Sequence, residues 1–96
     1  MMLVVTYDVD TTNAAGAKRL RQVAKTCQRY GMRVQNSVFE VVVDPAQLVK
    51  LKYELEKIID VELDSVRFYK LGSSFEHKIE TMGKTPIVQA GGSLIL

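Results

Sequence analysis

Runs of apolar residues along the chain predict strands separated by two helices. β-Branched or alternating apolar runs, typical of strands, occupy residues 3–8, 33–43, 64–71 and, as a short addition, 78–82. The first run is apolar on both faces, which is typical of a central strand covered on both sides. The second is long enough for a long hairpin or for one central strand. In the third, Val66 and Phe68 lie on one face, and Arg67 and Tyr69 lie on the other.

Two segments between these runs have the period of amphipathic helices. The first helix is predicted to begin near residue 13 or 14 and to end at about Tyr30, with Gly31 as its left-handed terminator. Its apolar face carries Ala17, Leu20, Val23, Ala24, Cys27 and Tyr30. The second helix is predicted to begin at Pro45, with Asp44 as its N-cap. Its apolar face carries Leu48, Leu51, Leu55, Ile58 and Ile59.

The order of these elements predicts one α+β domain. A chain of 96 residues corresponds to a single domain, and a helix that connects two strands of one sheet packs on a face of that sheet. We therefore expect a split β-α-β sandwich, in which both helices cover one face of an antiparallel sheet. Residues 1–83 would form this domain, and residues 84–96 would form a C-terminal tail.

Positive charge is concentrated in one part of the chain. Between Asp10 and Glu40 there are six basic residues and no acidic one, so this part carries +6 while the whole chain carries +2. The six residues are Lys18, Arg19, Arg21, Lys25, Arg29 and Arg33. Clustered positive charge of this kind is typical of a surface that binds nucleic acid.

Four of the six form a cationic stripe on the first helix, opposite its apolar face: Lys18, Arg21, Lys25 and Arg29. The stripe is about 16 Å long at the rise of an α-helix, which is enough to follow several phosphates. On the second helix the charges alternate in sign, as is usual on a solvated face. The stripe holds no aromatic or amide side chain, so we expect it to contact a nucleic-acid backbone without reading sequence.

Asp8, at the end of the first strand, is the candidate metal ligand. Carboxylate oxygens suit Mg²⁺ or Mn²⁺, and a bound cation can activate water and neutralise charge on a phosphate. A single aspartate at a strand end is more often a capping or loop-tying residue, and this alternative stays open. Asp10 is either a second ligand or a helix N-cap, and His77 is either part of the site or an exposed residue of a polar loop.

The remaining reactive residues favour no other chemistry. Cys27 is the only cysteine, which excludes an intrachain disulfide, and its place on an apolar helix face predicts a buried thiol. Ser37 has no evident base for a serine-type triad. The chain lacks the features of a signal peptide, and no segment approaches the length of a membrane span. We therefore expect a cytoplasmic protein without membrane contact.

Three motifs of the chain resemble a known family. They are Tyr7-Asp8, the strand Arg33-Val34-Gln35-Asn36-Ser37-Val38-Phe39-Glu40, and Arg67-Phe68-Tyr69. With the length and the basic helix, they make residues 1–83 similar to the small CRISPR-associated, nuclease-like subunit that works in spacer acquisition, the second of the two universal adaptation proteins.

The resemblance implies a ferredoxin-like fold and a homodimer. A C-terminal strand of each protomer would add an edge strand to the partner's sheet, and Asp8 would face its twin across the two-fold axis. It also implies a metal-dependent endonuclease, with Arg33 and Phe39 near the site. The substrate would be double-stranded DNA, which two cationic stripes suit best, or single-stranded RNA. Members of this family also bridge CRISPR integrase subunits and hold protospacer DNA.

The sequence therefore leaves three hypotheses for the function. The first is a dimeric endonuclease dependent on Mg²⁺ or Mn²⁺, with Asp8 as the metal ligand. The second is a non-catalytic dimeric scaffold that binds DNA through the first helix and docks the integrase. The third is a small metabolite-binding or regulatory domain. The fold would allow the third, but no glycine-rich phosphate loop or Cys/His cluster supports it.

Overall fold

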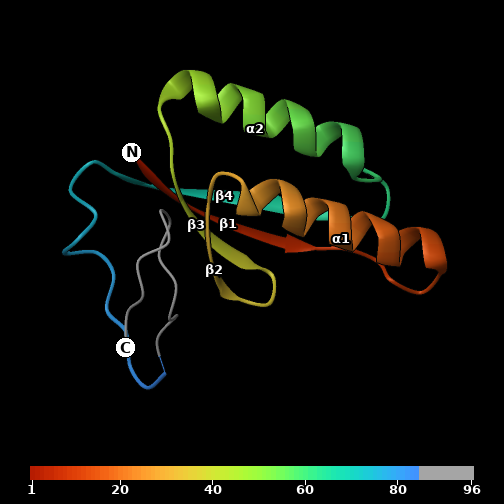
Figure 1. The fold of residues 1–96 in the computed structure, drawn as a ribbon, viewed down its shortest axis with the longest axis horizontal. Helices are drawn as coiled ribbons and strands as arrows, with labels where there is room; N and C mark the ends of the chain where they lie inside the picture. The colour runs from red at the N-terminus through yellow and green to blue at the C-terminus, as the bar shows by residue number, and fades with distance from the viewer. Residues whose placement is uncertain (85–96) are drawn as a thin grey trace.

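The computed structural model describes residues 1–84 and has a ferredoxin-like α+β fold, as predicted (Figure 1). In chain order the elements are β1 (Met2–Asp8), α1 (Ala14–Gln28), β2 (Gly31–Gln35), β3 (Val38–Val42), α2 (Pro45–Ile58) and β4 (Ser65–Gly72). The predicted C-terminal edge strand, and with it the pairing of the tail with another protomer, lies outside the described residues.

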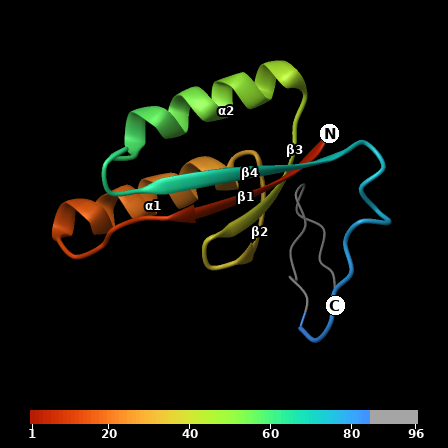
Figure 2. The ribbon, with the colours of Figure 1, turned by 180° about the vertical axis from the view of Figure 1, so that it is seen from behind.

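The sheet has the order β2-β3-β1-β4, and every neighbouring pair of strands is antiparallel. β1 and β2 are therefore separated by β3, which is the split β-α-β arrangement expected from the element order. Both helices lie on the same face of the sheet, as the two opposite views show (Figures 1 and 2). Among the described residues, no helix is long and apolar enough to cross a membrane.

β1 is central, as predicted, but the helices cover only one of its faces. Leu3, Val5 and Tyr7 are buried toward the helices, at 0%, 0% and 6% exposure. The alternate residues Thr6 and Asp8 point to the other face, which we call the open face of the sheet. The prediction that both faces of this strand are covered is therefore not met by the described part of the chain.

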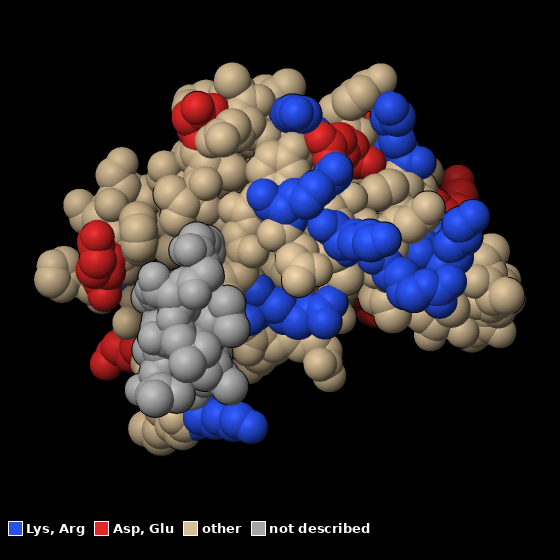
Figure 3. Space-filling model, viewed as in Figure 1, with Lys and Arg blue, Asp and Glu red and all other residues tan. Residues whose placement is uncertain are grey.

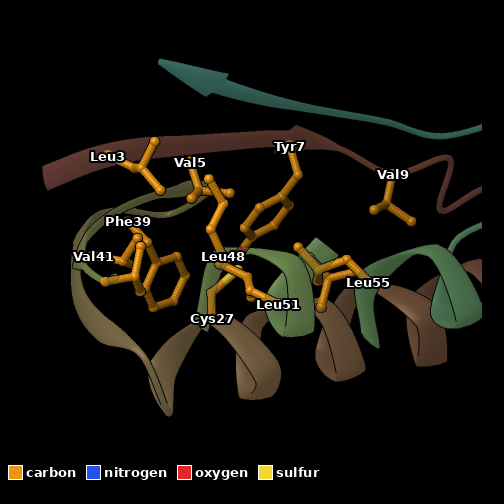
Figure 4. Packing of buried hydrophobic residues seen from close by; sticks show 12 residues of the cluster. Leu3, Val5, Tyr7, Val9, Cys27, Phe39, Val41, Leu48, Leu51 and Leu55 are labelled. Atoms are coloured by element: carbon orange, nitrogen blue, oxygen red, sulfur yellow. The ribbon is translucent and has the colours of Figure 1, made fainter. Parts of the chain in front are cut away.

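The core lies between the sheet and the two helices (Figure 4). Phe39 and Leu51 have no exposed surface and meet there from β3 and α2. Cys27 of α1 is also fully buried, as predicted. The start of α2 is as predicted too, since Asp44 accepts a hydrogen bond from the backbone of Gln47 (2.7 Å) and completes a capping box.

The segment 33–43 is a hairpin, so the alternative of one central strand is wrong. Its strands β2 and β3 are joined by a turn at Asn36 and Ser37. The register of β2 against β3 also shifts between Arg33 and Gln35. Neither turn residue is a glycine or has a positive φ, so the turn lacks the sequence signal that marks the tightest hairpins.

The prediction that Gly31 terminates the first helix in a left-handed conformation is wrong. α1 ends at Gln28, and Gly31 is the first residue of β2 with a negative φ. A side chain at this position would put its Cβ 2.1 Å from the carbonyl oxygen of Glu40 on β3. The glycine is therefore required by the close approach of two strands and not by a helix end.

Residues 78–82 do not form the predicted short strand. The backbone N–H of Lys78 donates to the carbonyl of Phe75 (2.9 Å), which closes a turn. The Nζ of Lys78 donates to the carbonyl of Leu71 (2.7 Å). The chain is thus folded back onto the end of β4 instead of extending beside it.

One buried carboxylate, that of Asp64, ties together three segments at the end of β1. Its Oδ1 accepts from the backbone N–H of Asp10 (3.0 Å), and its Oδ2 accepts from the backbone N–H of Asp60 (2.9 Å). The Nε of Arg19 on α1 donates to the same Oδ2 (2.8 Å). The pKa of Asp64 is held below its usual range mainly by the Arg19 guanidinium and also by the two backbone donors.

We expect Asp64→Asn to lower the free energy of unfolding by about 2 kcal/mol near neutral pH, because its charge-assisted hydrogen bonds are weakened. A carboxylate with a depressed pKa contributes stability above its usual pKa of 3.8 and loses it as the pH falls through the folded-state pKa. The gap between wild type and variant should therefore narrow below about pH 4. Urea unfolding of both proteins at a fixed protein concentration, from about pH 7 to about pH 3, measures this difference in the free energy of unfolding.

The control is Glu76→Gln, which makes the same charge change at an exposed turn residue. It should leave stability nearly unchanged over this range. A gap between wild type and Asp64→Asn that stays constant down to the lowest pH would contradict the assignment of an ionised, stabilising Asp64.

Candidate functional site

Asp8 is exposed at the end of β1 and points to the open face of the sheet. It lies opposite Ser65, the first residue of β4. Among residues 1–84 there is no group of three or more His, Cys, Asp or Glu side chains that could hold a metal ion. A single protomer therefore offers Asp8 as an isolated carboxylate, which fits Mg²⁺ only if other oxygen ligands come from water, substrate or a second protomer.

Asp10 has a structural role, although it is not the helix N-cap. Its Oδ1 accepts from the backbone N–H (3.0 Å) and the hydroxyl (2.7 Å) of Thr12. These two hydrogen bonds hold the pKa of Asp10 below its usual range, and the bond from the backbone N–H has the larger effect. The N-cap is Asn13, whose Oδ1 accepts from the N–H of Gly16 (2.9 Å). His77 is exposed in the turn after β4.

Arg33 and Phe39 lie together, but on the opposite face of the sheet from Asp8. They pair across β2 and β3, with the Arg33 guanidinium carbon 5.2 Å from the centre of the Phe39 ring. Phe39 also lies opposite Val5, which points toward the helices. The Phe39 ring is fully buried and cannot touch a substrate. Within one protomer, the structure therefore does not unite the predicted catalytic residues Asp8, Arg33 and Phe39.

Arg19 and Arg29 have acidic partners, so the cationic surface is smaller than predicted. Arg19 is largely buried and ion-paired with Asp64 on the inside of the fold. The Nη2 of Arg29 contacts Glu54 of α2, which also accepts from the hydroxyl of Tyr30 (2.9 Å). The sequence missed both partners because they lie 45 and 25 residues away along the chain.

The unpaired cations of α1 line a groove between α1 and the β2–β3 hairpin. Lys18, Arg21, Lys25 and Arg33 are exposed and make no ion pair with the described residues. The groove encloses about 700 Å³. Its basic and amide-bearing lining residues are Lys18, Arg21, Gln22, Lys25, Gln28, Arg33 and Asn36. Basic side chains gather over this region in the space-filling view (Figure 3).

The groove also carries amide side chains, which the cationic stripe itself lacks. Gln22, Gln28 and Asn36 supply amide groups beside the cations. Tyr7 forms part of the wall, and its hydroxyl donates to the carbonyl of Asn36 (3.2 Å). Burial raises the pKa of Tyr7, and the nearby Arg33 partly opposes this rise. The hydroxyl therefore stays protonated and serves as a neutral donor.

The comparison with protein families gives one match that covers most of the chain. Residues 1–79 match the family model described as CRISPR associated protein Cas2. A Rhodospirillum rubrum protein named CRISPR-associated endoribonuclease Cas2 3 is 57% identical, over 99% of this chain and 100% of its own length. A Halalkalibacterium halodurans protein named CRISPR-associated endonuclease Cas2 is 52% identical, over 99% of both chains.

Solved structures have the same fold. The crystal structure described as Streptococcus pyogenes Cas2 at pH 6.5 superposes with a TM-score of 0.78 and 57% sequence identity. The superposition covers 86% of this chain and 100% of that one. A Thermus thermophilus protein described as hypothetical protein TT1823 has a TM-score of 0.74 and 27% identity, over 93% and 96% of the two chains.

Cys27 should be unreactive in the folded protein. Burial raises the pKa of its thiol to about 11, although the positive charge of Arg33 acts in the opposite direction. Near pH 8 the thiolate, which is the reactive form, is therefore scarce and shielded. We expect alkylation by iodoacetamide to be at least about 100-fold slower in native buffer than in denaturant. Mass spectrometry measures the rate of alkylation, and equal rates in native buffer and in denaturant would show an accessible thiol.

Proposed function

The chain belongs to the Cas2 family of CRISPR-associated proteins, and we propose that it is a homodimeric, metal-dependent endonuclease that hydrolyses phosphodiester bonds. Its relatives are named endoribonuclease or endonuclease, which supports a nuclease role. The observation that carries the proposal is Asp8, an exposed carboxylate at the end of the central strand. Unlike Asp10 and Asp64, it has no hydrogen-bond donor among the described residues.

A homodimer would complete the site that one protomer leaves incomplete. The open face exposes Tyr69 of β4 at 46%, so it offers aromatic surface to a second copy. A two-fold axis near the end of β1 would bring two Asp8 carboxylates to one cation. Asp8 would hold Mg²⁺ or Mn²⁺ with waters and substrate oxygens, and the ion would supply an activated water and neutralise charge on the phosphate.

Double-stranded DNA is the substrate that the cationic groove favours. In a dimer there would be two such grooves, and a pair of cationic surfaces suits a duplex better than a short single strand. Single-stranded RNA is the second candidate, since the Rhodospirillum rubrum relative is named an endoribonuclease. The protein would act in the cytoplasm during spacer acquisition, where its dimer would bind the CRISPR integrase subunit.

A non-catalytic scaffold is the alternative function, and one feature of the structure favours it. The cationic groove lies on the helix side of the sheet, while Asp8 lies on the open face. Nucleic acid held in the groove of one protomer would therefore not reach the Asp8 carboxylate of the same protomer. In this alternative the dimer holds protospacer DNA and bridges integrase subunits, and Asp8 has no catalytic role.

We expect Asp8→Asn to abolish cleavage of labelled double-stranded DNA and single-stranded RNA in Mg²⁺ or Mn²⁺, with a loss of at least about 100-fold. The amide removes the negative charge that would hold the cation, while an exposed position should leave folding intact. The assay compares identically prepared wild type, Asp8→Asn and the exposed-residue control Glu62→Gln, with dimerisation measured by light scattering.

The outcomes separate the enzyme from the scaffold. Cleavage lost only in Asp8→Asn, with chelator-sensitive activity in the other two proteins, supports the enzyme. Equal cleavage in all three proteins points to a contaminant or to another site. Tight DNA binding by wild type without any cleavage supports the scaffold.

Charge reversal in the groove should weaken nucleic-acid binding. We expect Lys25→Glu to raise the Kd for duplex DNA about tenfold and to reduce the salt dependence by the equivalent of about one phosphate contact or more. Lys50→Glu makes the same change on the exposed part of α2, away from the groove, and should have a much smaller effect. Fluorescence anisotropy at several salt concentrations measures both, and equal effects would exclude a binding surface localised to the groove.

A further inference from the structure

The motif Arg67-Phe68-Tyr69 of β4 has no role in the site described so far. Its middle residue, Phe68, lies opposite Val5 and packs against the core on the helix side. Arg67 and Tyr69 lie opposite Thr6 and Val4, so they point to the open face. This is the face on which Asp8 lies.

Arg67 is the cation that the strand register places beside Asp8. Asp8 pairs with Ser65 and Thr6 pairs with Arg67, so Arg67 is the diagonal cross-strand neighbour of Asp8. Diagonal neighbours on one face are about 7–8 Å apart at the backbone, within reach of a long side chain. Among the residues that lie opposite the outward-facing side chains of β1, Arg67 is the only basic one.

The guanidinium of Arg67 is oriented but not neutralised. Its Nη1 donates to the hydroxyl oxygen of Tyr69 (3.2 Å), and both side chains are exposed. No carboxylate of the described residues forms an ion pair with Arg67, Asp8 included. The guanidinium therefore keeps most of its donors for a ligand. A planar fork of N–H donors matches the non-bridging oxygens of a phosphodiester.

We propose that Arg67 is the phosphodiester-binding residue of the Asp8 site, and that Tyr69 is a positioning residue that orients it. This inference rests on the proposed nuclease function. Binding of the phosphodiester to Arg67 does not itself require the metal. Arg67 would hold a non-bridging oxygen while water adds to phosphorus, the bond to the leaving oxygen breaks and that oxygen takes up a proton. Arg33, on the other face of the sheet, cannot serve this role in the same protomer.

The first test is cleavage by variants of Arg67 in the presence of Mg²⁺. We expect Arg67→Ala to lower kcat about 100-fold, as for loss of a donor to developing charge, with duplex affinity within about twofold of wild type. Arg67→Lys keeps the positive charge but lacks the planar fork of N–H donors, so its kcat should be about tenfold higher than that of Arg67→Ala. Lys70→Ala removes one charge from the same strand and should retain wild-type activity.

The positioning role of Tyr69 has its own readout. Tyr69→Phe removes only the hydroxyl that accepts from Arg67, so kcat should fall by about tenfold while the Kd for uncleaved DNA stays constant. In the background of Arg67→Ala, the same change should have no further effect. Additive losses in the double variant would contradict action through Arg67.

The second test does not depend on cleavage. The Asp8→Asn protein, labelled with ¹⁵N, is titrated with a phosphorothioate trinucleotide, and the side-chain Nε–H signal of Arg67 is followed by NMR. The signal is assigned from its absence in Arg67→Lys. We expect it to shift in a saturable manner, together with the backbone amide of Ser65. Shifts confined to residues of the α1 groove would overturn the proposal, as would wild-type kcat in Arg67→Ala.

The two tests distinguish failure of this inference from failure of the proposed function. A protein that cleaves nothing, but whose Arg67 signal responds to the trinucleotide, is no nuclease under these conditions and still has a phosphodiester site on the open face. A protein that cleaves with an unresponsive Arg67 is a nuclease without that site. If Arg67→Ala is monomeric by light scattering while Arg67→Lys is a fully active dimer, Arg67 acts in assembly and the proposal is wrong.

Discussion

The alternation of side chains along β1 decides which residues of this protein can act together. Because β1 is the central strand and only one of its faces is covered by the helices, every second residue belongs to the core and the others belong to the open face. Tyr7 therefore lies in the core and at the wall of the groove, while its neighbour Asp8 lies on the open face. A shift of the register by one residue would exchange these roles and expose the core.

The contacts of Asp64 connect this alternation to the stability of the fold. A domain of this size buries a modest core, and its single cysteine is buried as a free thiol. The end of β1 is held in part by the Asp64 carboxylate, which joins the loop after β1, helix α1 and the turn before β4. The next residue, Ser65, begins β4 opposite Asp8. The interactions that stabilise this end of the fold thus lie next to the candidate site.

Local chemistry made part of this fold predictable from the sequence. The apolar period of the helices, the Asp44-Pro45 start of α2 and the burial of Cys27 depend on residues close together along the chain, and the structure has all three. Long-range partners were not predictable in this way. Arg19 belongs to the same cluster of basic residues as Lys18 and Arg21, yet its side chain is ion-paired with Asp64 and largely buried. Gly31 resembles a helix terminator until β3 is placed against it.

The candidate site shows the same division between local and long-range information. Asp8 could be selected from its place at a strand end, but Arg33 and Phe39 were expected near it only because of the family resemblance, which does not show on which face of the sheet a residue lies. The pairing of β4 with β1 instead places Arg67 beside Asp8, and β4 begins more than fifty residues further along the chain. If nucleic acid binds as proposed, the cations of the groove would hold it on the helix side of the sheet, and Arg67 would hold it beside Asp8 on the open face. A second protomer would then be needed for both to contact one duplex, since the sheet of a single protomer separates them.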